Sequence, residues 1–273
     1  MATEKTDRSS ITVNDKKPVS GYAPVNGINM YYEIHGQGNP LVLIHGGGST
    51  IQTTFGYILP QLATHYQVIA LELQAHGHTS DRDSPESFEQ DADDVAALLS
   101  YLQIKKADLF GFSNGGNTAM QVSIRHPQLV RKLVIASAFY KMNGLVKGFF
   151  EMMAQAKLSD MPAYLQKDFL RINNDTNRLQ NMFEKDRNRM LQFKDWQDED
   201  LAAIKAPALL VFGDRDVATR EHAVDMSQKI PAAELLILPG NHGSYMGEAG
   251  TEVTDSAIPA LTVAVISAFL NRQ

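Results

Sequence analysis

The sequence has no cysteine in its 273 residues, and this absence excludes several kinds of chemistry at once. Without cysteine the protein cannot use a thiol nucleophile, build a disulfide framework or bind zinc through thiolates. An excess of positive charge is missing as well: 25 lysines and arginines stand against 31 aspartates and glutamates, for a formal net charge of −6. Because nucleic-acid-binding proteins present basic patches, no nucleic-acid partner is predicted.

Long hydrophobic runs are also missing. No apolar stretch approaches the roughly 20 residues that a membrane-spanning helix needs, so no membrane span is predicted. Residues 1–20 contain threonine, serine, lysine and aspartate without an apolar centre, unlike a signal peptide. We therefore expect a flexible tail over 1–20 and a cytoplasmic protein as written, or an exported one if a signal has been trimmed. The sequence leaves the oligomeric state open.

What the chain does contain is a series of strand-like apolar runs that alternate with helical patterns. Buried strands separated by helices predict a mostly parallel, doubly wound α/β sheet. The first two runs flank an Asn26-Gly27 pair, which is typical of a hairpin turn. The predicted strands are Tyr22–Val25, Ile28–His35, Leu41–His45, Tyr66–Leu73, Leu109–Phe110, Lys132–Ala136, Ala208–Phe212 and Glu234–Leu238.

Residues 139–206 interrupt this alternation. They contain no strand-like run, and they are dense in methionine and phenylalanine. We expect a helical cap inserted into a core formed by 21–138 and 207–273, with cap helices over Leu145–Ala156, Pro162–Ile172 and Asn177–Phe193. A short helix over Asp198–Ile204 is expected to lead back into the core. Outside the cap, helical spacing covers Thr54–Ala63, interrupted by Pro60, and predicts helices over Ser87–Leu102, Asn117–Arg125, Glu221–Ile230 and Ile258–Leu270.

The stretch Gly111-Phe112-Ser113-Asn114-Gly115 fits the pattern G-x-S-x-G and lies between a predicted strand and a predicted helix. A nucleophile elbow needs this context, because a sharp turn lifts the serine hydroxyl clear of the sheet. Glycine on either side is expected, since side chains there would crowd the turn. The sequence therefore predicts that Ser113 is a nucleophile.

A serine hydroxyl needs a base within hydrogen-bond reach, and that base needs an acid that orients it. His242 follows the last predicted strand, and two carboxylates, Asp214 and Asp216, follow the strand before it. Ligands of parallel α/β sheets bind at the carboxyl ends of the strands, where all of these residues lie. The order serine, aspartate, histidine is that of an α/β-hydrolase.

A reaction at a carbonyl also needs donors for the developing oxyanion. The backbone amide of Asn114 offers one donor, and the glycines 46–48 after the strand Leu41–His45 offer a second. Each such donor is worth about 3 kcal/mol of transition-state stabilisation.

Taken together, these motifs resemble an α/β-hydrolase-fold serine hydrolase, similar to the compact esterases and lactonases with a short cap. The resemblance extends from about Tyr22 to the C-terminus. It implies that Asp216, rather than Asp214, is the acid of the triad and that Gly47 supplies the second oxyanion amide. The motifs that carry it are His45-Gly46, Gln74-Ala75-His76-Gly77-His78-Thr79, Gly111–Gly115, His126-Pro127 with Val130–Val134, Gly213-Asp214-Arg215-Asp216 and the His242 loop.

In many relatives the strand that corresponds to Tyr66–Leu73 ends in an aspartate, and an arginine follows it. This sequence has Glu72 and Gln74 there, and the difference weakens any inference about substrate preference. His76 and His78 are two residues apart and together with His45 suggest a metal site, but no carboxylate or cysteine spacing around them matches a known one. We therefore expect no metal and no cofactor.

The predicted function is hydrolysis of an ester, lactone or thioester of small-molecule size. An aminopeptidase, a carbon–carbon bond hydrolase and a perhydrolase are alternatives on the same scaffold, as is a receptor that keeps the pocket without catalysis. A dinucleotide-binding enzyme fits less well, because Ser113 occupies the middle glycine position of G-x-G-x-x-G. An aminopeptidase would need cap acids to hold the substrate amine, and the cap offers Glu151, Asp160, Asp168, Glu184 and Asp186.

Overall fold

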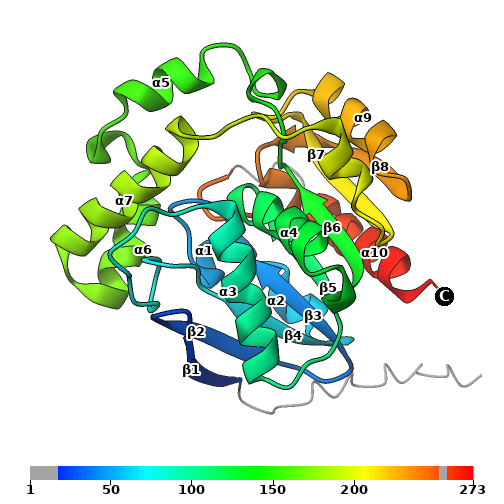
Figure 1. Ribbon diagram of the computed structural model, residues 1–273, viewed down its shortest axis with the longest axis horizontal. Helices are drawn as coiled ribbons and strands as arrows, with labels where there is room; N and C mark the ends of the chain where they lie inside the picture. The colour runs from blue at the N-terminus through cyan, green and yellow to red at the C-terminus, as the bar shows by residue number, and fades with distance from the viewer. Residues whose placement is uncertain (1–17, 252–256, 273) are drawn as a thin grey trace, which may run out of the picture.

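The computed structural model describes residues 18–251 and 257–272, and Figure 1 shows their arrangement. In that part of the chain, eight strands form one sheet in the order β1-β2-β4-β3-β5-β6-β7-β8. β2 pairs antiparallel with β1 and with β4, whereas all other neighbours are parallel, so the predicted mostly parallel sheet is confirmed. The strands are β1 Val19–Val25, β2 Ile28–His35, β3 Asn39–Ile44, β4 Tyr66–Leu71, β5 Ala107–Phe112, β6 Val130–Ala136, β7 Ala208–Arg215 and β8 Ala233–Asn241.

The first two strands form the predicted hairpin. Its turn is made by Asn26 and Gly27, which have φ angles of 44° and 87°. β1 begins at Val19, so Val19 and Ser20 pair with β2 although the sequence predicted them as part of the tail. Residues 1–17 of the predicted tail lie outside the described residues.

Helices cover both faces of the sheet, as the doubly wound prediction requires. Successive side chains of β3 point to opposite faces: Val42 and Ile44 join one apolar cluster, and Leu41 and Leu43 join the other. The first cluster contains α3 Phe88–Tyr101, α4 Asn114–Arg125, α8 Asp198–Ala202 and α9 Arg220–Lys229, and the second contains α1 Ile51–Phe55, α2 Leu59–Leu62 and α10 Ala257–Asn271.

The interrupted helical stretch predicted over Thr54–Ala63 forms two short helices, and the first begins earlier than predicted, at Ile51. Thr50 starts α1 early: its hydroxyl accepts from the Thr53 amide at 3.3 Å, and the Thr53 hydroxyl accepts from the Thr50 amide at 2.8 Å. This reciprocal pair is a capping box. Pro60 lacks an amide hydrogen, so it cannot continue α1 and instead lies in the first turn of α2.

Three helices follow β6, and we call them the cap helices: α5 Phe149–Gln155, α6 Ala163–Asn173 and α7 Thr176–Leu191. Figure 1 shows them grouped beyond the sheet. Residues of α6 and α7 form an apolar cluster of their own, with Met161 and Ala75. A separate small core is what an inserted unit needs, while the boundaries at 139 and 206 stay a prediction.

The first cap helix is shorter than the predicted Leu145–Ala156. Leu145 forms a β-bridge with Ala218, and the Val146 amide donates to the Val217 carbonyl at 2.8 Å. Gly148 then turns the chain with a φ of 87°, a left-handed conformation that favours glycine. Because Leu145 and Val146 pair with the loop that follows β7, α5 begins only at Phe149. Within the described ranges, no helix combines the length and apolar character needed to cross a membrane.

Candidate active site

Ser113 occupies the sharp turn between β5 and α4. Its φ and ψ of 53° and −123° are rarely adopted by a residue with a side chain, and such conformations cost about 1–3 kcal/mol. The flanking glycines are required by contact: a Cβ on Gly111 would lie 2.1 Å from the Gly115 carbonyl oxygen, and one on Gly115 would lie 2.1 Å from the Ile44 carbonyl oxygen. The packing of β5, α4 and β3 thus holds the serine in place.

Three side chains from separate strand ends meet at this turn. His242, directly after β8, places its Nε2 3.1 Å from the Oγ of Ser113. Its Nδ1 lies 2.6 Å from the Oδ1 of Asp216, which follows β7. With a neutral ring, Nδ1–H donates to the carboxylate and Nε2 accepts from the serine hydroxyl. His242 is therefore within hydrogen-bond distance of both Ser113 and Asp216, the two residues predicted to act with it.

Asp216 is held by further donors, whereas Asp214 is not directed toward the histidine. The carboxylate of Asp216 accepts from the backbone amides of Gly213 at 3.2 Å and Val217 at 2.7 Å, and from the hydroxyl of Ser137. Asp214 instead accepts from the amide of Gly240 at 2.7 Å. Of the two carboxylates that the sequence left open, only Asp216 contacts His242 among the described hydrogen bonds.

The charge of Asp216 sets the protonation of the pair. Burial favours the neutral imidazole, but the adjacent Asp216 carboxylate outweighs it and, with a smaller contribution from Glu248, raises the pKa of His242 above its usual value. Burial also raises the pKa of Glu248 to about 7. For Asp216, burial acts upward, but His242 and the other donors outweigh it and lower the pKa.

These shifts predict a pH profile. A base must be neutral to accept a proton, so kcat/KM should fall as the pH drops through the pKa of His242. Because that pKa is raised, the midpoint of the acid limb is expected above about 6.5, the ordinary histidine value. Glu248→Gln removes a neighbouring negative charge and should lower the midpoint. Rates measured from pH 5 to 9 check this, and a wild-type midpoint below the ordinary value would contradict it.

The glycine loop after β3 passes directly against the serine turn. A Cβ on Gly46 would lie 3.3 Å from the Cβ of Ser113, and one on Gly47 would lie 2.5 Å from the Nδ2 of Asn114. Glycine at both positions lets the loop lie this close without displacing Ser113 or the side chain of Asn114. Gly47, Ser113 and Asn114 also line one cavity. The two amides predicted to receive an oxyanion therefore belong to segments in contact with Ser113.

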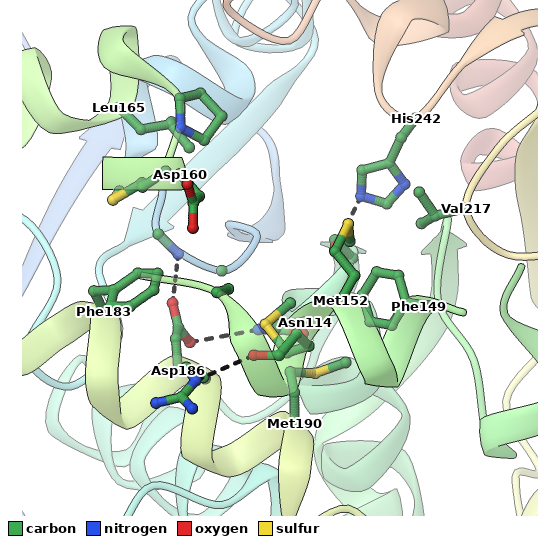
Figure 2. A pocket seen from close by; sticks show the side chains of 18 of the residues that line it. Asn114, Phe149, Met152, Asp160, Leu165, Phe183, Asp186, Met190, Val217 and His242 are labelled. Carbon is green, nitrogen blue, oxygen red and sulfur yellow. Dashed lines mark hydrogen bonds between the residues drawn. The ribbon is translucent and has the colours of Figure 1, made fainter. Parts of the chain in front are cut away.

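That cavity has a volume of about 810 Å³ and lies between the strand ends and the cap helices. His242 lines one side of it, and Phe183 and Asp186 of α7 lie opposite (Figure 2). Its walls are mainly apolar, and five methionines contribute to them: Met152, Met153, Met161, Met182 and Met190. The sequence had left open which cap residues line the pocket.

The buried side chain of His45 forms hydrogen bonds with the backbone of the glycine loop and of the segment that follows β4. His45 is neutral, because burial and then His76 lower its pKa to about 3. Its Nδ1–H donates to the Gly46 carbonyl at 2.7 Å, and its Nε2 accepts from the Leu73 amide at 3.0 Å. Among the described residues, no three histidines, aspartates or glutamates gather in a way that could hold a metal ion.

Sequence reasoning missed the role of two charges on α7. Asp186 and Arg189 are buried and form an ion pair with each other. Asp186 reaches the glycine loop and the side chain of Asn114, and Figure 2 shows both contacts. A signal existed: the positions 179, 182, 186, 189 and 193 follow helical spacing, so these two charges stand on the buried stripe of the helix.

Comparisons with known proteins identify the family of the fold. A family model described as the alpha/beta hydrolase fold matches residues 39–169. The chain is 32% identical over 263 residues to the dihydrolipoyllysine-residue acetyltransferase component of the acetoin cleaving system of Pseudomonas putida, covering 89% of this chain and 70% of that protein. It is 29% identical over 247 residues to the human serine hydrolase BPHL, covering 83% and 81% of the two chains.

A solved structure gives the same fold. The crystal structure of a serine hydrolase involved in carbazole degradation matches with a TM-score of 0.75 at 22% identity, covering 93% of this chain and 99% of that one. At such identity the likeness concerns the fold. Together with the long match to the Pseudomonas putida relative, it leads to one conclusion: the chain belongs to the α/β-hydrolase-fold family of enzymes.

Proposed function

We propose that this enzyme hydrolyses a carboxylic ester, lactone or thioester through an acyl-enzyme on Ser113. The observation that carries the proposal is the position of the His242 imidazole, whose two nitrogens lie 3.1 Å from the Ser113 hydroxyl and 2.6 Å from the Asp216 carboxylate. This is the arrangement that activates a serine, and the name of the human relative, a serine hydrolase, supports it.

In the proposed first half-reaction, the Ser113 oxygen attacks the substrate carbonyl while Nε2 of His242 takes its proton. The ring becomes an imidazolium, which the buried Asp216 carboxylate stabilises. The backbone amides of Gly47 and Asn114 donate to the oxyanion of the tetrahedral intermediate. His242 then gives its proton to the leaving alcohol or thiol, and the acyl group remains on Ser113.

In the second half-reaction, water replaces the leaving group. His242 takes a proton from this water as its oxygen attacks the acyl carbonyl, and the same two amides receive the new oxyanion. Collapse of the intermediate breaks the bond to Ser113, and His242 returns the proton to the serine oxygen. Each step uses a hydrogen bond or an amide donor of this chain, and no cofactor takes part in the proposed sequence.

The cavity points to an apolar group on the substrate. Its methionine side chains are flexible and polarisable, so they can pack against hydrocarbon of varied shape. Asp186 lines the cavity too, but its charge is paired with Arg189 and with His76. A carboxylate already paired in this way has less to offer a substrate amine, so Asp186 favours an ester over an aminopeptidase substrate. Asp160 also lines the cavity and is the cap acid that a substrate amine could meet instead.

This argument gives a prediction for a series of p-nitrophenyl esters. Each methylene buried against the cavity wall contributes about 0.8 kcal/mol, so kcat/KM should rise about fourfold per methylene from acetate until the space is filled. Met153→Gln keeps the length of the side chain but adds a polar amide, and it should flatten the series. A wild-type preference for acetate would contradict the assignment.

The proposal is distinguished from a non-catalytic receptor by a fluorophosphonate probe. An activated serine reacts with such a probe, and the Ser113→Ala variant provides the blank. Stoichiometric labelling, located on Ser113 by peptide mass spectrometry, is the expected result. A wild-type protein that stays unlabelled while correctly folded would favour the receptor.

A further inference from the structure

Asp186 reaches from cap helix α7 to the glycine loop beside Ser113. Its Oδ2 accepts from the backbone amide of Gly48 at 2.5 Å and lies 2.9 Å from Nε2 of His76. We propose that Asp186 is a positioning residue, which holds Gly47 and Gly48 in the conformation that receives the oxyanion; this inference rests on the proposed hydrolysis.

The same carboxylate also contacts the other side of the expected oxyanion site. Its Oδ1 accepts from the Nδ2 of Asn114 at 3.4 Å, and it accepts from the guanidinium of Arg189. Asn114 and Gly47 carry the two proposed oxyanion amides. Asp186 therefore ties together two segments that are 66 to 67 residues apart in the chain, and it does so from a third segment, the cap. Figure 2 shows Asp186 between the loop amide and Asn114.

The loop conformation needs such a restraint. Gly48 has a φ of 64°, in the left-handed region, and glycine loses more conformational freedom on ordering than other residues. Three consecutive glycines, 46–48, are therefore costly to hold in one shape. The amide of Gly48 is fixed by Asp186, which in turn fixes the peptide plane that follows Gly47.

The surroundings keep Asp186 charged and stationary. Burial disfavours its charge, but His76 and then Arg189 outweigh burial and hold its pKa well below the usual value. Burial also opposes the charge of His76, yet Asp186 raises the pKa of that ring to about 9. Arg189 is buried as well, and Asp91 accepts from it at 2.7 Å. A buried network with this many contacts has little freedom to rearrange.

The test is Asp186→Asn, which keeps the shape but leaves one oxygen and one amino group. In one rotamer the amide oxygen faces Gly48 and His76, and the amino group then faces the donors of Arg189 and Asn114. In the other rotamer the amino group faces the Gly48 amide, so in both rotamers two donors oppose each other. Because the loop is loosened rather than removed, kcat for p-nitrophenyl butyrate should fall about 10- to 100-fold. This decrease is no larger than the decrease of about 100- to 1,000-fold that follows removal of a whole oxyanion donor. KM should change by no more than about twofold.

The chain offers a matched control on cap helix α6. Asp168 also accepts from the segment after β3, in this case from the Thr50 hydroxyl at 2.6 Å, and it also pairs with an arginine three residues later, Arg171. It does not touch the backbone of the glycine loop among the described contacts. Asp168→Asn should therefore keep kcat within about twofold of wild type. Equal losses in both variants would assign the effect to cap attachment in general and overturn the proposal.

A measurement on the wild-type protein covers the case in which Asp186→Asn does not fold. In a ¹⁵N-glycine spectrum, the Gly48 amide should be protected from hydrogen exchange, because Asp186 accepts its hydrogen. Rapid exchange there, or an Asp186→Asn protein with wild-type kcat, overturns the inference. If instead the wild type hydrolyses no ester yet Gly48 is protected, the proposed function has failed while the contact stands.

Discussion

Replacing Ser113 with alanine is expected to lower kcat for p-nitrophenyl butyrate by about 10⁴- to 10⁶-fold, the range found when a serine nucleophile is removed. The reason is that no other hydroxyl among the described contacts lies within hydrogen-bond reach of Nε2 of His242. Alanine keeps the Cβ and demands the same backbone conformation, so folding should be preserved. Initial rates, with a thermal unfolding curve for each protein, check both statements.

The double variant sharpens this result. If Ser113 and His242 act as one unit, Ser113→Ala combined with His242→Ala should cost about as much as either change alone. Additive losses would mean that the two side chains act independently, against the 3.1 Å contact between them. A Ser113→Ala protein within about tenfold of wild type would remove this serine from the proposed mechanism.

The second large effect is expected for Asp216→Asn, at about 10⁴-fold in kcat. A neutral amide does not stabilise the imidazolium, and its amino group can donate to Nδ1 and impose the wrong tautomer on His242. The change also disturbs the other donors that meet this carboxylate, including the amides of Gly213 and Val217. Initial rates at the pH optimum of the wild-type protein measure the loss.

Asp214→Asn is the matched control. Its amide oxygen can still accept from Gly240, and its one ion pair among the described residues, with Arg215 at 3.6 Å, is between exposed groups. Exposed pairs of this kind contribute at most about 1 kcal/mol, so activity should stay close to wild type. A severe loss in Asp214→Asn with a mild one in Asp216→Asn would exchange the roles of the two carboxylates.

Local signals allowed much of the fold and of the candidate site to be predicted. Ser113, His242 and the two carboxylates Asp214 and Asp216 each follow a strand that is recognisable by itself, and the rule that parallel strands end at one edge brings them together. The choice of Asp216 over Asp214 came from the family resemblance. The glycines of the elbow are equally local, since Gly111 and Gly115 are needed wherever a helix packs this tightly on its preceding strand.

What could not be predicted depends on partners far along the chain. Leu145 pairs with Ala218, which lies 73 residues later in the chain. The sequence pattern near Leu145 does not indicate this bridge, so it could not show that the helix begins only at Phe149. The contact between Asp186 and Gly48 spans 138 residues. The sequence offered Asp186 only as one acid among several in the cap, because burial beside Arg189 and His76 is a property of the assembled core.

Cap helix α7 forms both a partly exposed and a buried ion pair, and salt is expected to affect the two differently. Lys185 and Asp81 form a pair at 2.6 Å with side chains 16% and 30% exposed, whereas the side chain of Arg189 is only 2% exposed beside Asp186. Mobile ions screen charges in contact with water over a Debye length of about 8 Å, and they screen buried pairs much less. High salt should therefore weaken the ion pair between Lys185 and Asp81, and it should weaken the buried pair between Arg189 and Asp186, beside the glycine loop, much less.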